Sequence, residues 1–83
     1  MREVKLGQAV FSKAGHDKGR WFAVVGVEEN FALIADGKSR KLDKPKRKKL
    51  MHLSAANTVF QESDLRTDKA LREAIKNRFG CDQ

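Results

Sequence analysis

Residues 38–49 carry the strongest chemical signal in this chain, because eight cationic side chains fall within twelve positions. The formal net charge of the whole chain is +7, and this segment accounts for all of it, since the other basic and acidic residues cancel. Such a concentrated positive field favours contact with a polyanion, whose phosphates the side chains would neutralise. The alternative is a solvated run of charges without a specific partner. The cations are Lys38, Arg40, Lys41, Lys44, Lys46, Arg47, Lys48 and Lys49.

A glycine-rich loop supplies the second group of candidate residues. Residues 14–20 read Ala-Gly-His-Asp-Lys-Gly-Arg, so Lys18 and Arg20 lie beside a bend made by two glycines. Gly15 and Gly19 stand where a hairpin loop needs positive φ or a close backbone approach. We expect this loop to contact phosphates, and the alternative is an ordinary hairpin turn with solvated charges.

Two aromatic residues, Trp21 and Phe22, follow the loop directly. Neighbouring residues of a strand point to opposite faces, so one should lie in the core and the other should be at least partly exposed. An exposed ring beside Arg20 would be able to stack on an unpaired base. Packing in the core or against the loop is the alternative for either ring, and the same question applies to Phe11.

The residue types and spacings do not favour catalysis or metal binding. The segment from Gly15 to Arg20 is one residue shorter than a phosphate-binding loop of nucleotide hydrolases and lacks its Lys-Ser/Thr pair. His16, His52 and one cysteine do not have the paired spacing of a zinc site. We therefore expect no enzymatic activity, no cofactor, no metal and no small-molecule substrate.

The elements that must position these residues read as short antiparallel strands, because apolar runs rich in β-branched and aromatic residues alternate with turn residues. After an edge strand or a lead-in over residues 1–8, the pattern predicts strands at 8–13, 20–29 and 31–35, with a bulge at Gly26. Shorter strands are expected at 39–42, 48–55 and 58–61. Mainly β structure follows.

The last segment changes to a helical period. Leu71, Ala74, Ile75 and Phe79 fall on one face, which predicts a helix over about residues 68–79 that packs on the strands. Thr67 is the expected N-cap, and Gly80 is the expected residue that ends the helix.

Length and composition indicate a single domain, residues 1–83. The one cysteine, Cys81, excludes an internal disulfide and fits a reducing cytosol. The first five residues lack the apolar run of a signal peptide, and no stretch is long enough to span a membrane. We expect a cytoplasmic protein without a membrane partner.

Residues 7–37 resemble the KOW motif, a short RNA-binding unit of several large-subunit ribosomal proteins and of the transcription factor NusG. The resemblance is carried by Gly7-x-x-Val10, by Gly15-His16-Asp17-Lys18-Gly19-Arg20, and by the apolar strand that reaches Val27. It is closest to the archaeal- and eukaryote-type ribosomal KOW proteins and their small bacterial relatives. Gly19 would be the glycine that defines the motif, and Val24 and Val27 would be its core positions.

The resemblance implies a small SH3-like antiparallel β-barrel with one C-terminal helix, binding ribosomal or other structured RNA in association with the ribosome. The RNA-binding residues would be the basic segment 38–49 together with Gly15, His16, Lys18, Gly19, Arg20 and Trp21. One alternative is a protein-interaction module of the transcription or translation machinery, with the Trp21/Phe22 surface or the helix as its interface. Double-stranded DNA is a further alternative that charge alone leaves open.

Overall fold

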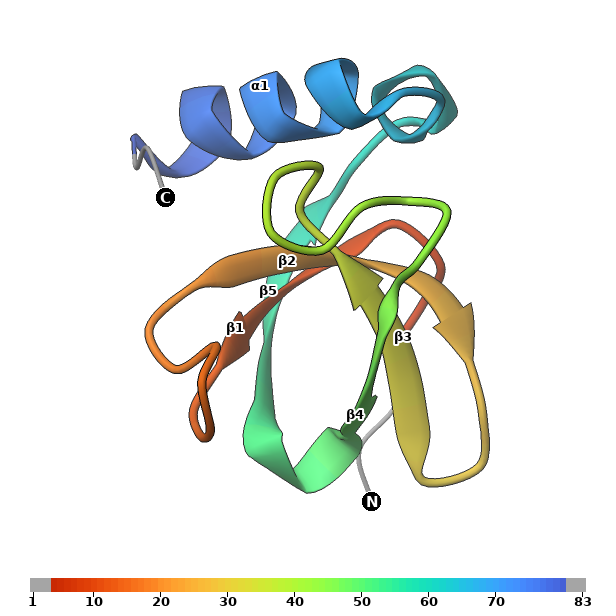
Figure 1. Cartoon of the computed structure of the whole chain (residues 1–83), viewed down its shortest axis with the longest axis vertical. Coiled ribbons are helices and arrows are strands. Elements are labelled where there is room, and N and C mark those ends of the chain that lie inside the picture. The colour runs from red at the N-terminus through yellow and green to blue at the C-terminus, as the bar shows by residue number, and fades with distance from the viewer. Residues whose placement is uncertain (1–3, 81–83) are drawn as a thin grey trace.

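Five antiparallel strands form one sheet in the order β4-β3-β2-β1-β5, and a C-terminal helix lies across it (Figure 1). This computed structural model describes residues 4–80. The strands are β1 (Gln8–Ser12), β2 (Trp21–Val27), β3 (Phe31–Ala35), β4 (Lys46–Lys49) and β5 (Leu53–Val59). Two short 3₁₀ turns, η1 (Leu50–His52) and η2 (Glu62–Leu65), precede β5 and the helix α1 (Asp68–Phe79). Mainly β structure with one C-terminal helix is therefore confirmed.

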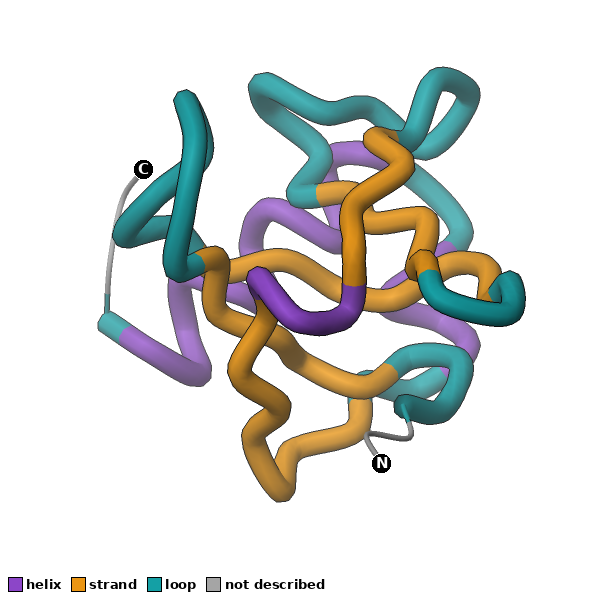
Figure 2. The backbone as a smooth tube through the Cα atoms, turned by 90° about the horizontal axis from the view of Figure 1, so that it is seen from below, coloured by secondary structure: helices purple, strands orange, loops and turns teal. Residues whose placement is uncertain are grey.

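The sheet has an apolar core on each of its faces, because successive side chains of β1 and β2 alternate between them. We call one of these cores the inner core, because it lies inside the curve of the strands. Figure 2 shows that curve of the backbone from below. The expected bulge lies directly before Gly26, since the register between β2 and β3 shifts between Val24 and Gly26. Val24 is in this core as expected, but the expectation for Val27 is wrong, since Val27 is 50% exposed at the end of β2. The buried residues of the inner core are Val10, Phe22, Val24, Ala32, Ile34 and Leu53.

The outer core lies between the sheet and α1 and is built on a row of alanines. Ala9 pairs with Ala23, and Ala23 pairs with Ala35, so three small side chains stand side by side across three strands. Their size leaves room for Leu71 and Ile75 of α1, which are buried in the same cluster. The apolar face predicted for the helix therefore packs on the sheet.

The ends of α1 are those the sequence predicts. Thr67 is the N-cap, and its Oγ1 accepts a 3.0 Å hydrogen bond from the backbone N–H of Ala70. Gly80 ends the helix at φ 67°, a left-handed conformation that glycine adopts without strain. No helix within residues 4–80 has the length and apolar character that crossing a membrane would require.

The strand predicted at residues 39–42 is wrong. A turn replaces it, because the buried carboxylate of Asp36 accepts hydrogen bonds from the backbone N–H groups of Lys38 and Arg40, both 2.9 Å long. A side chain that binds nearby backbone in this way competes with strand pairing. At the other end of the turn, the N–H of Leu42 donates to Asp68 Oδ1 at the start of α1.

The predicted strands at 48–55 and 58–61 also need correction. The first of these is divided by η1 into parts of two strands. Strand β4 begins before it, at Lys46, and β5 begins after η1, at Leu53. The second does not exist separately, since β5 continues to Val59 and the N–H of Phe60 then donates to the carbonyl of Gly7. Cys81, the one cysteine, lies outside the described residues.

Candidate nucleic-acid interface

The loop between β1 and β2, residues 13–20, is closed by backbone hydrogen bonds at its base and in its tip. Ser12 and Arg20 pair across the base, and the N–H of Gly19 donates to the carbonyl of Ser12 at 2.9 Å. Gly15 and Gly19 have φ values of 80° and 87°, so the positive φ expected at both glycines is confirmed. The tip exposes His16 and Lys18 to solvent.

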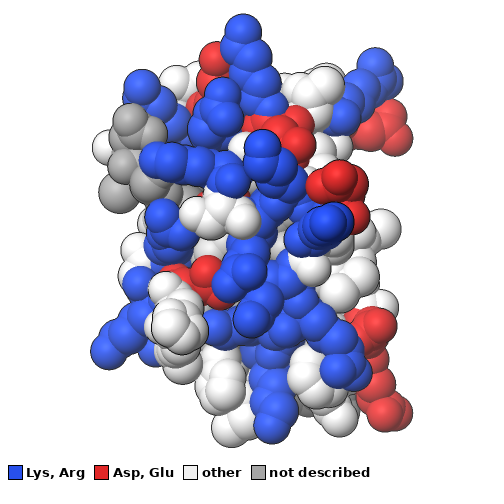
Figure 3. Space-filling model, in the orientation of Figure 1, with Lys and Arg blue, Asp and Glu red and all other residues white. Residues whose placement is uncertain are grey.

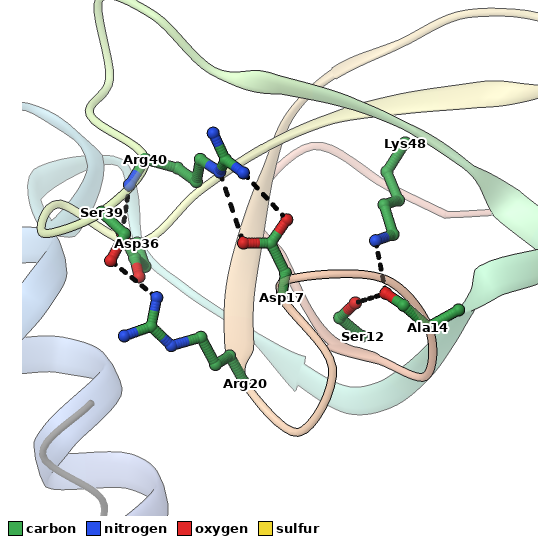
Figure 4. Close-up of polar contacts among 8 residues, drawn as sticks. All are labelled: Ser12, Ala14, Asp17, Arg20, Asp36, Ser39, Arg40 and Lys48. Carbon is green, nitrogen blue, oxygen red and sulfur yellow. Dashed lines mark hydrogen bonds and ion pairs between the residues drawn. The ribbon is translucent and has the colours of Figure 1, made fainter.

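Asp17 ties this loop to the basic segment. Its side chain is 4% exposed and faces Arg40, whose Nε and Nη2 lie 3.4 and 3.3 Å from the two carboxylate oxygens (Figure 4). A fork of this kind fixes orientation as well as distance. Arg40 is therefore neutralised within the protein and positions the loop.

Lys48 makes a second tie between the basic segment and the loop. Residues of β4 pair with β3, and the pairing of Lys48 with Ala32 places Lys48 on the inner face of the sheet. Its Nζ donates a 2.6 Å hydrogen bond to the carbonyl of Ala14, which also accepts from Ser12 Oγ (Figure 4). Lys48 is 8% exposed, so its charge acts on the loop and not on a ligand at the surface.

A third contact joins Arg20, at the end of the loop, to Ser39 in the turn after β3. Arg20 Nη1 donates to Ser39 Oγ at 2.6 Å. Together with the contacts of Arg40 and Lys48, this bond makes the glycine loop and residues 38–49 parts of one continuous surface.

Arg47 is partly neutralised by its surroundings. Its Nε lies 2.6 Å from Glu28 Oε1, and its guanidinium carbon lies 3.7 Å from the centre of the Phe31 ring. Both partners come from the neighbouring hairpin of β2 and β3. This ion pair is exposed, so a phosphate would be able to compete for the guanidinium.

The remaining lysines of the basic segment, together with Lys18 of the glycine loop, are available for an external anion. Figure 3 shows Lys and Arg side chains covering most of the face over β4 and the loop that precedes it. Six lysines have ammonium groups that make no ion pair or side-chain hydrogen bond within residues 4–80. All six are exposed except Lys46, which is half-buried. They are Lys18, Lys38, Lys41, Lys44, Lys46 and Lys49.

The aromatic residues after the loop are split between the two faces, as the alternation predicts. Phe22 is fully buried in the inner core, and Trp21 is partly exposed on the outer face. The Trp21 ring is stacked on Phe79 of α1, with centroids 3.8 Å apart and planes 5° apart. That face of Trp21 is therefore occupied by the protein.

Two acids that help to position the surface, Asp17 and Asp36, were not among the sequence-based candidates. Asp17 and Asp36 are buried acids whose partners are the backbone and cations of the basic face. The available signal for Asp17 was an acidic residue inside an otherwise cationic glycine loop. Among the described residues, no three His, Cys, Asp or Glu side chains gather where they would be able to hold a metal ion.

No protein-family model and no curated protein matches this chain. The functional conclusion therefore rests on the surface itself. Its features are one basic face, a glycine loop fixed to that face by three side-chain contacts, and a set of lysines whose ammoniums have no partner within residues 4–80.

Proposed function

We propose that this chain is a non-catalytic RNA-binding protein that holds structured RNA on the face formed by the glycine loop and residues 38–49. Ribosomal RNA and a ribosome-associated role in the cytoplasm are the setting that the resemblance to KOW proteins suggests. The observation that supports the proposal best is the junction of the loop and the basic segment through Arg40–Asp17 and Lys48–Ala14.

The physical basis of binding is neutralisation of phosphates by the exposed lysines. Each phosphate contact releases a condensed counterion, which favours association and makes it sensitive to salt. Contacts to phosphate and sugar position a protein without reading base identity, so the shape of the RNA should matter more than its sequence. Gly15 and Gly19 let the backbone of the loop approach the RNA closely, and His16 is exposed beside them.

We also propose that the sheet is an SH3-like barrel of the KOW type. The strand order supports this, since β2, β3 and β4 form a meander and β5 returns to pair with β1. The turn η1 links β4 and β5, the two edge strands, across the open side of the curved sheet (Figure 1).

The protein-interaction alternative has less support from the geometry than it had from the sequence. Phe22 is buried, Trp21 is stacked on Phe79, and the apolar face of α1 lies on the sheet. The two surfaces expected to serve as that interface are therefore largely used within the fold.

The test compares two variants of the full chain that lose the same charge. The surface variant changes Lys38, Lys41, Lys44 and Lys49 to Gln, and the control variant changes Arg66, Lys69, Arg72 and Lys76, which lie on or before α1, to Gln. All eight side chains are exposed, so both variants should fold, and circular dichroism checks this. Fluorescence anisotropy with a labelled structured RNA then gives the dissociation constants.

The surface variant should lose at least about tenfold in RNA affinity, and the control should lose much less. Equal losses would mean that net charge alone attracts RNA, which would contradict a specific face. An unmodified chain that binds no RNA would leave the protein-interaction alternative as the better one.

A further inference from the structure

We infer that the RNA bound on this face is a double-helical segment whose bases stay stacked on one another and are not taken up by the protein. The inference rests on the proposed function and names the class of RNA that it would recognise. It is carried by the placement of the aromatic side chains, which single-strand-binding surfaces use as stacking platforms.

The chain has six aromatic residues, one Trp and five Phe, and all of them lie within the described residues. Three of them form a cluster at the outer face of the sheet. Trp21 is stacked on Phe79 at 3.8 Å, and Phe11 packs against Trp21 with ring centroids 5.0 Å apart and planes at 60°. The cluster ties β1, β2 and α1 together, so its rings serve the fold.

The other three rings are also engaged. Phe22 is fully buried in the inner core, and Phe60 is 8% exposed with an edge contact to Phe79. Phe31 lies at the basic face, but the guanidinium of Arg47 covers its ring at 3.7 Å. Phe31 is half-buried under this contact, so the basic face offers a base no fully exposed Phe or Trp ring. His16, at the tip of the loop, is the exposed ring among residues 4–80 on this face.

A single strand would gain little from such a face beyond its charge. Stacking of one base on an aromatic ring is worth about five- to 150-fold in affinity, and it provides most of the salt-independent binding of unpaired strands. A duplex needs no such platform, because its bases are already stacked and it presents phosphates and 2′-hydroxyls at fixed spacing.

The rigidity of the face suits a ligand of fixed shape. Arg40 and Asp17 hold the loop from one side, Lys48 holds it at Ala14, and Arg20 is fixed on Ser39. A surface that is already ordered loses little conformational entropy on binding, provided that the phosphates of the ligand are ordered as well. Duplex RNA meets that condition better than a flexible strand does.

The test uses the unmodified chain and three labelled probes: an RNA hairpin with a long stem, oligouridine of equal length, and a DNA duplex with the sequence of the stem. Dissociation constants are measured across a salt series. The emission of Trp21, the single Trp of the chain, is recorded at saturation as a second readout. The expected result is that the RNA stem binds at least about tenfold more tightly than oligouridine, and that no probe quenches the emission of Trp21.

The other outcomes separate failure of the duplex inference from failure of the proposed function. Oligouridine binding as tightly as the stem, keeping its affinity in about 1 M salt, or quenching Trp21 would overturn the duplex inference and leave RNA binding intact. Tighter binding of the DNA duplex than of the RNA stem would overturn both the inference and the assignment of RNA. Absence of binding to every probe would overturn the proposed function itself.

Discussion

The ammonium of Lys48 donates a 2.6 Å hydrogen bond to the carbonyl of Ala14, and this bond joins β4 to the loop between β1 and β2. The neighbouring Lys49 pairs across the sheet with Phe31 and is exposed. Two consecutive lysines thus have different roles, because neighbouring residues of a strand face opposite sides of the sheet. One positions the glycine loop, and the other is free to meet a phosphate.

Substitution of these two lysines by Met should separate the two roles. Lys49→Met should reduce the magnitude of the log–log salt slope of RNA binding by about 0.9, because one phosphate contact is lost. Lys48→Met should weaken binding through loss of the loop anchor while the slope stays the same. The measurement is RNA affinity of both variants at several salt concentrations. An equal loss of slope in both would contradict the positioning role of Lys48.

Arg40→Met should destabilise the fold, because it leaves the carboxylate of Asp17, which is 4% exposed, without its cation. The expected cost in free energy of unfolding is about 1–2 kcal/mol, since Arg40 itself is only 32% exposed. Arg66→Met is the matched control. Its ion pair with Glu62 is 3.8 Å long and well exposed, so its loss should cost less than about 0.5 kcal/mol. Urea unfolding gives both values, and similar costs would mean that the Arg40–Asp17 pair contributes no more than a surface pair.

Gly37→Ala should be more damaging than Gly19→Ala. Both glycines have positive φ, 79° and 87°, which costs about 1–2 kcal/mol for a residue with a Cβ. At Gly37 the added Cβ would also collide with the carbonyl of Asp68 at the start of α1, whereas at Gly19 it would meet no atom within 4 Å. Thermal unfolding of the two variants checks the order, and a more stable Gly37→Ala variant would contradict this packing of the turn against the helix.

Ala23→Val should destabilise the protein because Ala23 is the centre of the alanine row beneath α1 and is fully buried. Added volume at such a site costs about 1–3 kcal/mol. Ala55→Val adds the same two methyl groups at an exposed position of β5 and should change the free energy of unfolding by less than about 0.5 kcal/mol. Denaturant midpoints of the two variants provide the comparison, and equal midpoints would show that the helix does not press on Ala23.

The sequence predicts those parts of the fold that depend on residues close together along the chain. The caps at Thr67 and Gly80, the helix between them and the bulge at Gly26 all depend on residues that are near in sequence. The turn at residues 39–42 was missed because it depends on Asp36 being buried, and burial is set by the tertiary structure.

The sequence predicts which cations make up the candidate site. It does not predict which of them bind other parts of the protein and which remain open to an external anion. In the sequence, Arg47, Lys48 and Lys49 are equivalent cations. Their roles differ because of the register of β4 on β3 and because of contacts to Glu28 and Ala14, which lie 19 and 34 positions away. The environment of Trp21 also depends on a residue far away in the sequence, because its ring is stacked on Phe79, the last residue of α1.

The central claim is that the basic face neutralises an RNA backbone, and the salt dependence of RNA binding tests it most directly. If about four to six of the exposed cations reach phosphates, a plot of log affinity against log salt concentration should have a slope of roughly −3 to −5 for the unmodified chain. A slope near zero, or no affinity for RNA at low salt, would contradict the claim.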